Sequence, residues 1–192
     1  MRAVRRLAGH ELRLLWSLVL WAARRGQGPA GGQGFGYARG QGPVTAGFAF
    51  VCVVETVAMS VLLKDWPTVH AVVLFLDVYT IVLVVALHAS AVVRPHVLDP
   101  DAGSLRIRRY VHVDLEVPLE RIASVRRELR TTHERAEGEL DVEVGSRTTV
   151  TLELTEPVTH VTFLGRRRAV RVVRFHADDA GALVRALGRA RA

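Results

Sequence analysis

Two apolar runs separated by five residues decide the fold: Val44–Leu63, VTAGFAFVCVVETVAMSVLL, and Val69–Val93, VHAVVLFLDVYTIVLVVALHASAVV. They are 20 and 25 residues long. Because an α-helix rises about 1.5 Å per residue, each is long enough to cross a hydrocarbon core of about 30 Å. The connection, Lys64–Thr68 (KDWPT), contains the helix breaker Pro67, and Trp66 suits a headgroup region. So short a connection predicts an antiparallel helical hairpin that spans a membrane twice.

Arginines on both sides of the hairpin predict its orientation. Arg24, Arg25 and Arg39 precede it, and Arg94 and a basic run at 106–109 follow it, whereas the connection offers Lys64 next to an aspartate. Positively charged residues flank membrane helices on the cytoplasmic side. We therefore expect a multi-pass protein of the plasma (inner) membrane with both termini in the cytoplasm. The alternative is a helical hairpin buried in a soluble core, which would have to cover 25 nearly uninterrupted apolar residues.

The net charge of +7 is unevenly distributed. Residues 1–43 carry +6, residues 44–93 carry −2 and residues 94–192 carry +3. Most of the excess flanks the apolar block, and no aromatic residues interleave the arginines as they do on nucleic-acid platforms. The distribution favours membrane topology, and we expect no nucleic-acid partner. Cys52 is the single cysteine, which excludes an internal disulfide.

The segment before the hairpin divides into two parts. In residues 1–25, Leu14, Leu18 and Trp21 fall on one helical face and Arg13, Ser17 and Arg24 on another. This pattern predicts an amphipathic helix lying in the membrane interface, the alternative being a helix packed on the soluble domain. Residues 26–43 are rich in glycine and predict a flexible linker. The G-x-G-x-x-G at 26–31 lacks the preceding strand that a dinucleotide site needs, so we interpret it as part of that linker.

Two acids lie inside the apolar runs. Glu55 precedes Trp66 by eleven residues and Asp77 follows it by eleven. In a tight hairpin both therefore lie about 16 Å from the turn, near the bilayer midplane. Two carboxylates side by side repel each other at low dielectric, so at least one would be protonated and hydrogen-bonded to the other. Helical spacing also places His70 and His88 on the same face as Asp77.

Three interpretations of this intramembrane polar pair remain open. A shared proton between Glu55 and Asp77 could hold two helices, or two subunits of a homo-oligomer, in register. The acids and His88 could form part of a proton or cation path. A metal site is the third, and it is disfavoured because both histidines lie about 10 Å or more from Asp77 along the helix axis.

After Arg94 the apolar period changes from helical to two. The alternation predicts half-buried strands at 111–117, 140–144 and 150–154, with further strands at 104–109, 123–130, 158–164 and 168–175. Residues 144–148 (VGSRT) are typical of a hairpin connection. Asp178 or Asp179 precedes an apolar stripe formed by Leu183, Val184 and Leu187, which predicts a capped C-terminal helix. The fold class is thus a two-span helical hairpin followed by a mainly-β domain, residues 94–192, of about seven antiparallel strands and a helix.

Residues 105–125, LRIRRYVHVDLEVPLERIASV, resemble the start of bacterial pleckstrin-homology-like (PH-like) domains. In that family paired strands lead into a Pro-Leu-x-x-Ile-x-x-Val segment, here Pro118, Leu119, Ile122 and Val125. Several members carry the domain directly after a two-span hairpin, and the whole chain is similar to small actinobacterial integral membrane proteins of unknown function. The family often has Gly in the first hairpin turn, where this chain has Arg109-Tyr110. The resemblance implies a fold and membrane association.

The cytoplasmic part offers no catalytic or metal-ligand motif: G-x-S-x-G, H-E-x-x-H and C-x-x-C are absent from the sequence. We expect no catalytic residues, no metal and no cofactor. Its densest basic run contains Arg166, Arg167 and Arg168 in a turn. This run is either a solvated hairpin tip or a contact with anionic lipid. The sequence predicts a non-enzymatic, membrane-anchored binding or assembly module with an unknown protein partner. The alternative is a small oligomeric proton- or cation-coupled membrane protein that uses Glu55 and Asp77.

Overall fold

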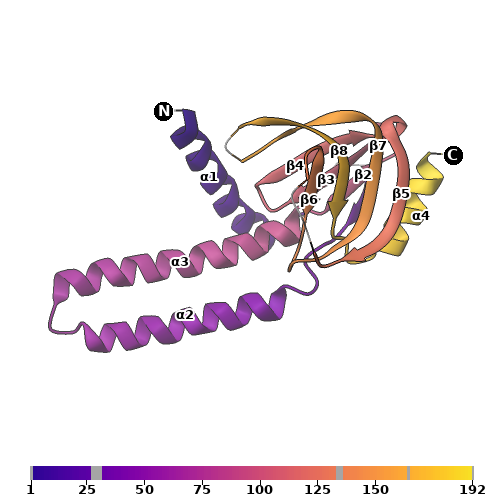
Figure 1. Ribbon diagram of the computed structural model, residues 1–192. Helices are drawn as coiled ribbons and strands as arrows, with labels where there is room; N and C mark the ends of the chain where they lie inside the picture. The colour runs from indigo at the N-terminus through magenta and orange to yellow at the C-terminus, as the bar shows by residue number, and fades with distance from the viewer. Residues whose placement is uncertain (1, 27–31, 133–135, 164, 192) are drawn as a thin grey trace.

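In a computed structural model, residues 2–26, 32–132, 136–163 and 165–191 of the chain are described. Two long apolar helices leave one side of a β domain and run side by side to a tight turn (Figure 1). The β domain consists of two sheets of mostly antiparallel strands and a C-terminal helix. The G-x-G-x-x-G segment lies largely in residues 27–31, outside the described residues.

The helical hairpin is formed by α2 (Gly42–Leu62) and α3 (Pro67–Val93). A proline occupies the first turn of each helix, where its missing N–H has no intrahelical partner to lose. Both helices are long and apolar enough to cross a membrane, by length and composition. The boundaries agree with the prediction of 44–63 and 69–93 to within two residues.

Very little of the hairpin is covered by the rest of the protein. Cys52 is the one buried residue of α2. In α3 the buried residues all fall in the last eight positions, from Ala86 to Val93, where the helix enters the β domain. Large apolar side chains such as Phe50 and Phe75 are each 68% exposed. The apolar surface of a core helix would be packed against its own domain, and the surface of this hairpin is not.

Helix α1 (Arg2–Ala22) crosses α3 obliquely near the base of the hairpin (Figure 1). Leu14 is buried against Ala86 of α3 and against Val111, which lies in a turn of the β domain. The opposite side of the helix leaves Leu12 and Trp16 exposed, with Val19 next along the same stripe. The helix thus packs on α3 by one face and keeps a second apolar face uncovered.

The first sheet has the order β1-β2-β3-β4, and all of its strand pairs are antiparallel. Its strands are β1 (Gln33–Phe35), β2 (His96–Asp99), β3 (Ser104–Arg109) and β4 (Val113–Pro118). Strand β1 comes from the segment predicted to be a linker, 26–43, so that prediction was wrong for its middle part. Phe35 and Tyr37 are buried in the domain because β1 pairs with β2.

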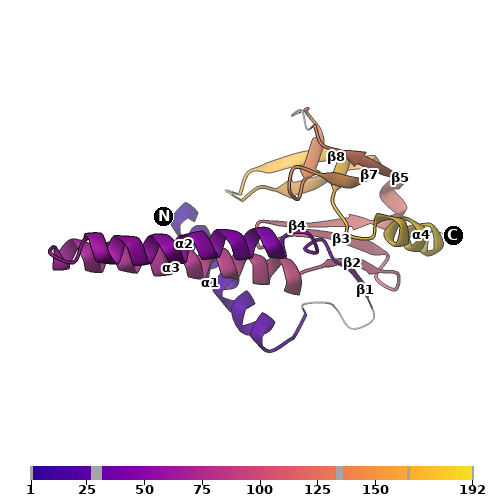
Figure 2. The ribbon, with the colours of Figure 1, turned by 90° about the horizontal axis from the view of Figure 1, so that it is seen from below.

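The second sheet has the order β5-β7-β8-β6. It contains β5 (Ile122–Arg130), β6 (Glu139–Val142), β7 (Thr148–Val161) and β8 (Arg167–Phe175), and the 3-10 turn η1 (Leu119–Arg121) leads into it. The two sheets stack face to face (Figure 2). Strand β7 joins the two strands predicted at 150–154 and 158–164, with an irregularity in its pairing between Glu153 and Val158.

The predicted hairpin at 144–148 is only partly correct. The turn forms, with Val144 bridged to Arg147 and left-handed backbone at Gly145 and Ser146. Strand β6 nevertheless pairs with β8, in parallel, rather than with β7. The described part of residues 94–192 thus contains seven strands, β2 to β8, in agreement with the prediction, and β1 adds an eighth from residues 33–35. The pairing of β6 with β8 is parallel, whereas all seven were predicted to be antiparallel.

Helix α4 (Ala180–Ala190) closes the stack of sheets. The Asp179 carboxylate accepts a hydrogen bond of 2.8 Å from the backbone N–H of Ala182, which confirms the predicted cap. Leu183 and Leu187 are fully buried in the core between the two sheets. Leu119 and Ile122, two residues of the Pro-Leu-x-x-Ile-x-x-Val segment, belong to the same core.

A buried polar group organises the junction between the first sheet and the rest of the domain. His96 Nε2 lies 2.8 Å from the carbonyl oxygen of His176, and its Nδ1 lies 3.1 Å from the backbone nitrogen of Arg108. The Arg108 N–H donates to Nδ1, so Nε2 must carry the proton and donate to the carbonyl. Burial lowers the pKa of His96 to about 4, and the ring stays neutral in this network.

The turn between β3 and β4 depends on a neighbouring contact. Tyr110 adopts a left-handed φ of 50°, at the position where the PH-like family often has Gly. Its backbone N–H donates a 2.7 Å hydrogen bond to the hydroxyl of Tyr37. Tyr37 is 1% exposed, and this burial raises the pKa of its hydroxyl. Tyr37, from the segment predicted to be a linker, thus stabilises a left-handed turn conformation that is usually adopted by glycine.

The neutral state of His96 predicts a pH-dependent stability. Since its pKa is about 4 in the folded chain and about 6.5 when unfolded, the unfolded state takes up the proton first as the pH falls. The folded chain should lose about 2 kcal/mol of stability between pH 7 and pH 5 through this residue. Urea unfolding in detergent micelles at pH 7, 6 and 5, followed by circular dichroism, measures the loss. The variant His96→Gln should flatten the pH dependence and His70→Gln, in α3, should not; equal slopes in both would contradict this role.

Candidate functional site

The predicted lipid-contact arginines lie at the tip of the β7–β8 hairpin. Arg166, Arg167 and Arg168 are all exposed, and within the described chain no carboxylate forms an ion pair with any of them. The turn is closed by hydrogen bonds between Thr162 and the backbone of Gly165 and Arg166, at 2.7–3.0 Å. The tip therefore presents three unneutralised guanidinium groups on a defined scaffold.

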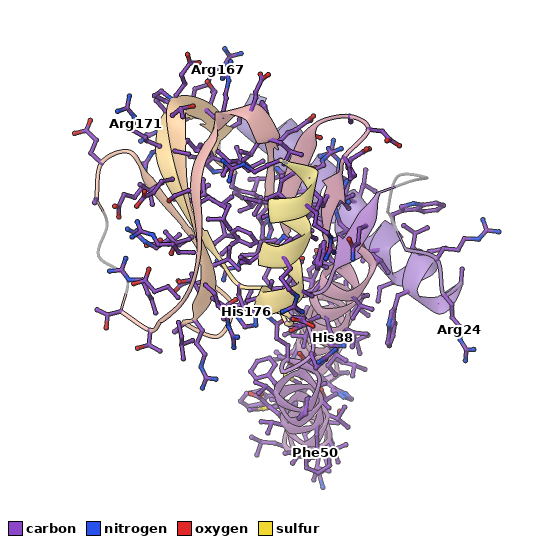
Figure 3. The ribbon with its side chains drawn as sticks, turned by 90° about the vertical axis from the view of Figure 1, so that its right-hand side faces the viewer. Arg24, Phe50, His88, Arg167, Arg171 and His176 are labelled. Atoms are coloured by element: carbon purple, nitrogen blue, oxygen red, sulfur yellow. The ribbon has the colours of Figure 1, made fainter. Side chains whose placement is uncertain are left out.

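The tip reaches towards the helices. In Figures 1 and 2 it is the part of the second sheet that extends furthest in the direction in which α2 and α3 project. The ring of Phe163 packs 4.6 Å from the ring of His10 in α1 and 4.9 Å from that of His112 in the β3–β4 turn. Because α1 also packs on α3, these contacts fix the basic tip relative to the base of the hairpin. Figure 3 views the molecule from the β-domain end and places Arg167 and Arg171 at the opposite edge from Phe50.

A groove of about 460 Å³ lies beside the tip. One wall is the loop before β6, with Glu137, and the start of β6, with Glu139. The other is formed by the ends of β7 and β8, with His160, Arg167 and Arg168. Burial, helped by the charge of Arg168, lowers the pKa of His160, so this ring is neutral at pH 7. Two carboxylates on one wall face two guanidinium groups on the other, so the charges of the groove balance and do not favour a ligand of either sign.

The predicted polar pair in the hairpin is not joined in this structure. Glu55 lies on the exposed side of α2. Asp77 is half-buried in α3, and its Oδ2 is covered without a hydrogen-bond partner. Among the described residues no hydrogen bond or ion pair connects the two carboxyl groups. Glu55 and Asp77 are equally far from Trp66 in the sequence. The two side chains nevertheless differ in exposure, because they lie on different faces of their helices.

The two histidines of α3 lie in different surroundings. His70, near the turn, has a covered Nε2 without a partner. His88 lies at the base of the hairpin, where its ring meets the edge of Trp21 at 6.2 Å and its Cε1 lies close to Gly42, the first residue of α2. His88 thus marks the junction of all three helices. Within the described residues, no group of three His, Cys, Asp or Glu side chains is placed to hold a metal ion.

One cluster of charged residues was not singled out by the sequence. Arg94 directly follows α3, Arg106 and Arg108 lie on β3, and all three approach the carboxylate of Asp114 on β4. Arg106 and Arg108 alternate along β3, and Asp114 lies on β4, so the period of two could have indicated that these side chains share one face of the sheet. The sequence analysis used the arginines only to predict the orientation of the hairpin in a membrane.

Comparisons of this chain with protein-family models, with curated proteins and with solved structures found no match.

The contact between α1 and the basic tip predicts a specific crosslink. With Cys52 replaced by serine, the pair His10→Cys and Phe163→Cys should be joined by a flexible bismaleimide crosslinker, because the two rings that they replace are in contact, with centroids 4.6 Å apart, and the spacer fills the space that the rings leave. The control pair His10→Cys and Leu129→Cys, with the second cysteine at an exposed position of β5, should not be joined. Mobility on a non-reducing gel reports the result, and equal crosslinking in the two pairs would mean that the tip does not rest on α1.

Proposed function

We propose that this protein is a membrane-anchored, non-enzymatic binding or assembly module. In this proposal α2 and α3 span the plasma (inner) membrane, both termini are cytoplasmic, and the PH-like β domain is held against the inner leaflet. The observation that carries the proposal is the hairpin itself: two helices of 21 and 27 residues whose large apolar side chains are mostly exposed along α2 and along α3 as far as Val82.

Energetics favours a bilayer around these helices. Burial of a Val, Leu or Phe side chain is worth about 1.5–3 kcal/mol, and a folded domain is stable by only about 5–15 kcal/mol. Exposed apolar side chains along both helices would make the chain insoluble in water without a covering phase. Hydrocarbon of about 30 Å thickness covers such helices without demanding a partner surface.

The placement of the basic groups supports the same orientation. The arginine tip and α1 lie on the side of the β domain from which the hairpin leaves (Figure 1). Arg94 lies at the end of α3, on the domain side of the hairpin. An anionic leaflet attracts each nearby Arg by about 1 kcal/mol. The PH-like assignment is supported by two stacked sheets closed by a C-terminal helix, with Leu119 and Ile122 in the core.

Contact between the tip and the leaflet predicts an effect of charge reversal. A fluorophore on Val161→Cys, in a Cys52→Ser background, should be quenched by headgroup-labelled lipid in vesicles that contain anionic phospholipid. Changing Arg166, Arg167 and Arg168 to Glu should reduce the docked fraction, because three arginines contribute about 3 kcal/mol, or about a hundredfold in the docking ratio.

Two controls separate docking from general charge effects. The variants Arg185→Glu and Arg189→Glu, on α4, change the net charge away from the tip and should leave quenching unchanged. Raising the salt concentration from 0.1 M to 1 M shortens the screening length from about 10 Å to about 3 Å and should weaken quenching. Equal quenching in tip and α4 variants would contradict contact of the tip with lipid.

A second candidate function is favoured by one observation. The covered, unpartnered Oδ2 of Asp77 is an unsatisfied polar atom within an apolar hairpin, and such groups mark proton and ion pathways in membranes. A small oligomeric proton- or cation-coupled protein would use Asp77 with Glu55. Purified protein in vesicles with an imposed pH gradient should then dissipate it, and Asp77→Asn should abolish the flux while Glu11→Gln leaves it intact. We expect no flux from the anchored module, so flux that depends on Asp77 would favour this second function.

A further inference from the structure

A basic pocket lies where α1, the end of α3 and the first sheet meet. It has a volume of about 310 Å³ and is lined by Arg13 and Trp16 of α1, Arg94 after α3, Arg106 of β3 and Asp114 of β4. Four separate segments contribute to it, so the pocket exists only when α1 is docked on the hairpin and the β domain. None of these residues belongs to the tip of the β7–β8 hairpin.

Positive charge exceeds negative charge inside this pocket. Arg106 donates two hydrogen bonds of 2.6 and 2.9 Å to the carboxylate of Asp114, and Arg94 donates a third of 3.4 Å to the same carboxylate. Among the residues that line the pocket, two guanidinium groups therefore share one carboxylate, which leaves a charge of about +1 before Arg13 is counted.

Arg13 adds a further charge that the pocket leaves unbalanced. Within the described chain its guanidinium forms no ion pair. Burial lowers the pKa of Arg94, Asp114 acts in the opposite direction, and repulsion from Arg13 adds a smaller lowering. The Nε of Arg94 is covered and has no hydrogen-bond partner. An anion between Arg13 and Arg94 would remove the repulsion and accept hydrogen bonds from both guanidinium groups.

The depth of the pocket matches that of lipid headgroups. Arg94 follows Trp66 by 28 residues, and at about 1.5 Å per residue α3 carries it roughly 42 Å from the turn. A bilayer is about 40–45 Å thick when its headgroup regions are included. If Trp66 lies at the outer interface, Arg94 lies at the inner one, and Trp16 beside it has the side chain that favours this depth.

The pocket continues into an apolar surface. Leu12, Trp16 and Val19 form one stripe on α1 at spacings of four and three residues, and all three are more than half exposed. A soluble anion would use only the arginines. A molecule with a phosphate and acyl chains would fill the pocket with the first and cover the stripe with the second.

We infer that this pocket binds the phosphodiester headgroup of an anionic phospholipid of the inner leaflet. Arg13 and Arg94 donate to the phosphate oxygens, Arg106 is held in place by Asp114, and Trp16 packs where the headgroup joins the acyl chains. Guanidinium groups suit this ligand because they donate paired hydrogen bonds to phosphate. The inference rests on the proposed function, since a lipid reaches the pocket only when the hairpin is in a bilayer.

Trp16 provides the probe for a direct test. In the full chain with Trp21→Phe and Trp66→Phe, it is the single remaining tryptophan. The protein is placed in nanodiscs of phosphatidylcholine that contain a fixed small fraction of either brominated phosphatidylglycerol or brominated phosphatidylcholine. Quenching of Trp16 by the brominated phosphatidylglycerol should exceed that by the brominated phosphatidylcholine.

Arginine variants test whether the pocket causes the preference. Arg13→Gln and Arg94→Gln should each reduce the preference for phosphatidylglycerol about fivefold, the change that corresponds to about 1 kcal/mol per Arg. The matched control Arg189→Gln, on α4, should retain the full preference. Arg13→Gln is the more telling variant because this exposed side chain has no partner in the described chain whose loss could disturb folding.

Each other outcome overturns part of the account. Equal quenching by the two lipids, or equal preference in all three variants, would overturn the pocket assignment. If millimolar inorganic phosphate abolished the preference in the wild-type pocket, the ligand would be a soluble phosphate and the lipid assignment would fail. A chain that does not enter nanodiscs at all would contradict the proposed function, whereas a chain that enters without preference contradicts only this inference.

Discussion

The apolar surface of the hairpin is the constraint on which the other features depend. The β domain covers only the last eight residues of α3, and α1 crosses a short part of the same helix. Over the remainder of both helices, many Val, Leu and Phe side chains, among them Phe50, Phe75 and Val61, are largely exposed. The hydrophobic effect must be satisfied from outside the chain, and a bilayer does this without a specific partner. The orientation of every basic group then follows from the position of the hairpin.

If the hairpin is the membrane anchor that we propose, three contacts orient the β domain on it. Leu14 packs α1 on α3, the ring of Phe163 packs on α1, and Tyr37 holds the β3–β4 turn close to the base of the hairpin. Together these contacts link both sheets to the helices. A tethered domain without them would sample many orientations. The contacts instead hold the arginine tip and the pocket around Arg94 on the side of the β domain that faces the helices, which is the arrangement that our proposed contact with a charged leaflet requires.

The sequence predicts the elements whose signal is local. Two long apolar runs gave α2 and α3 to within two residues, and the change to a period of two gave β4, β6 and part of β7. The further strands predicted at 104–109, 123–130 and 168–175 match β3, β5 and β8 to within one residue. Asp179 capped the C-terminal helix as its position before an apolar stripe suggested. These features depend on neighbouring residues, and so the one-dimensional pattern contains them.

Features that depend on distant partners were missed. Strand β1 has only three residues in a glycine-rich segment and exists because it pairs with β2, more than 60 positions away. Strand β6 looked like half of a hairpin but finds its partner in β8. Counting residues from Trp66 placed Glu55 and Asp77 at the same depth. Whether their side chains meet depends on how the two helices are rotated about their axes, which the count does not give. The charge cluster around Asp114 required β3, β4, α1 and α3 to be placed in space.

The central claim is that hydrocarbon surrounds the hairpin, and a spin label tests it most directly. Val54→Cys and Val78→Cys, each with Cys52→Ser, place a nitroxide about 18 Å from the turn on α2 and α3. In reconstituted vesicles both labels should collide frequently with oxygen and rarely with a water-soluble nickel chelate, and a label on Leu129→Cys should behave in the opposite way. Labels at 54 and 78 that are accessible to nickel, or sheltered from both reagents, would place them in water or in a protein interior and contradict the account.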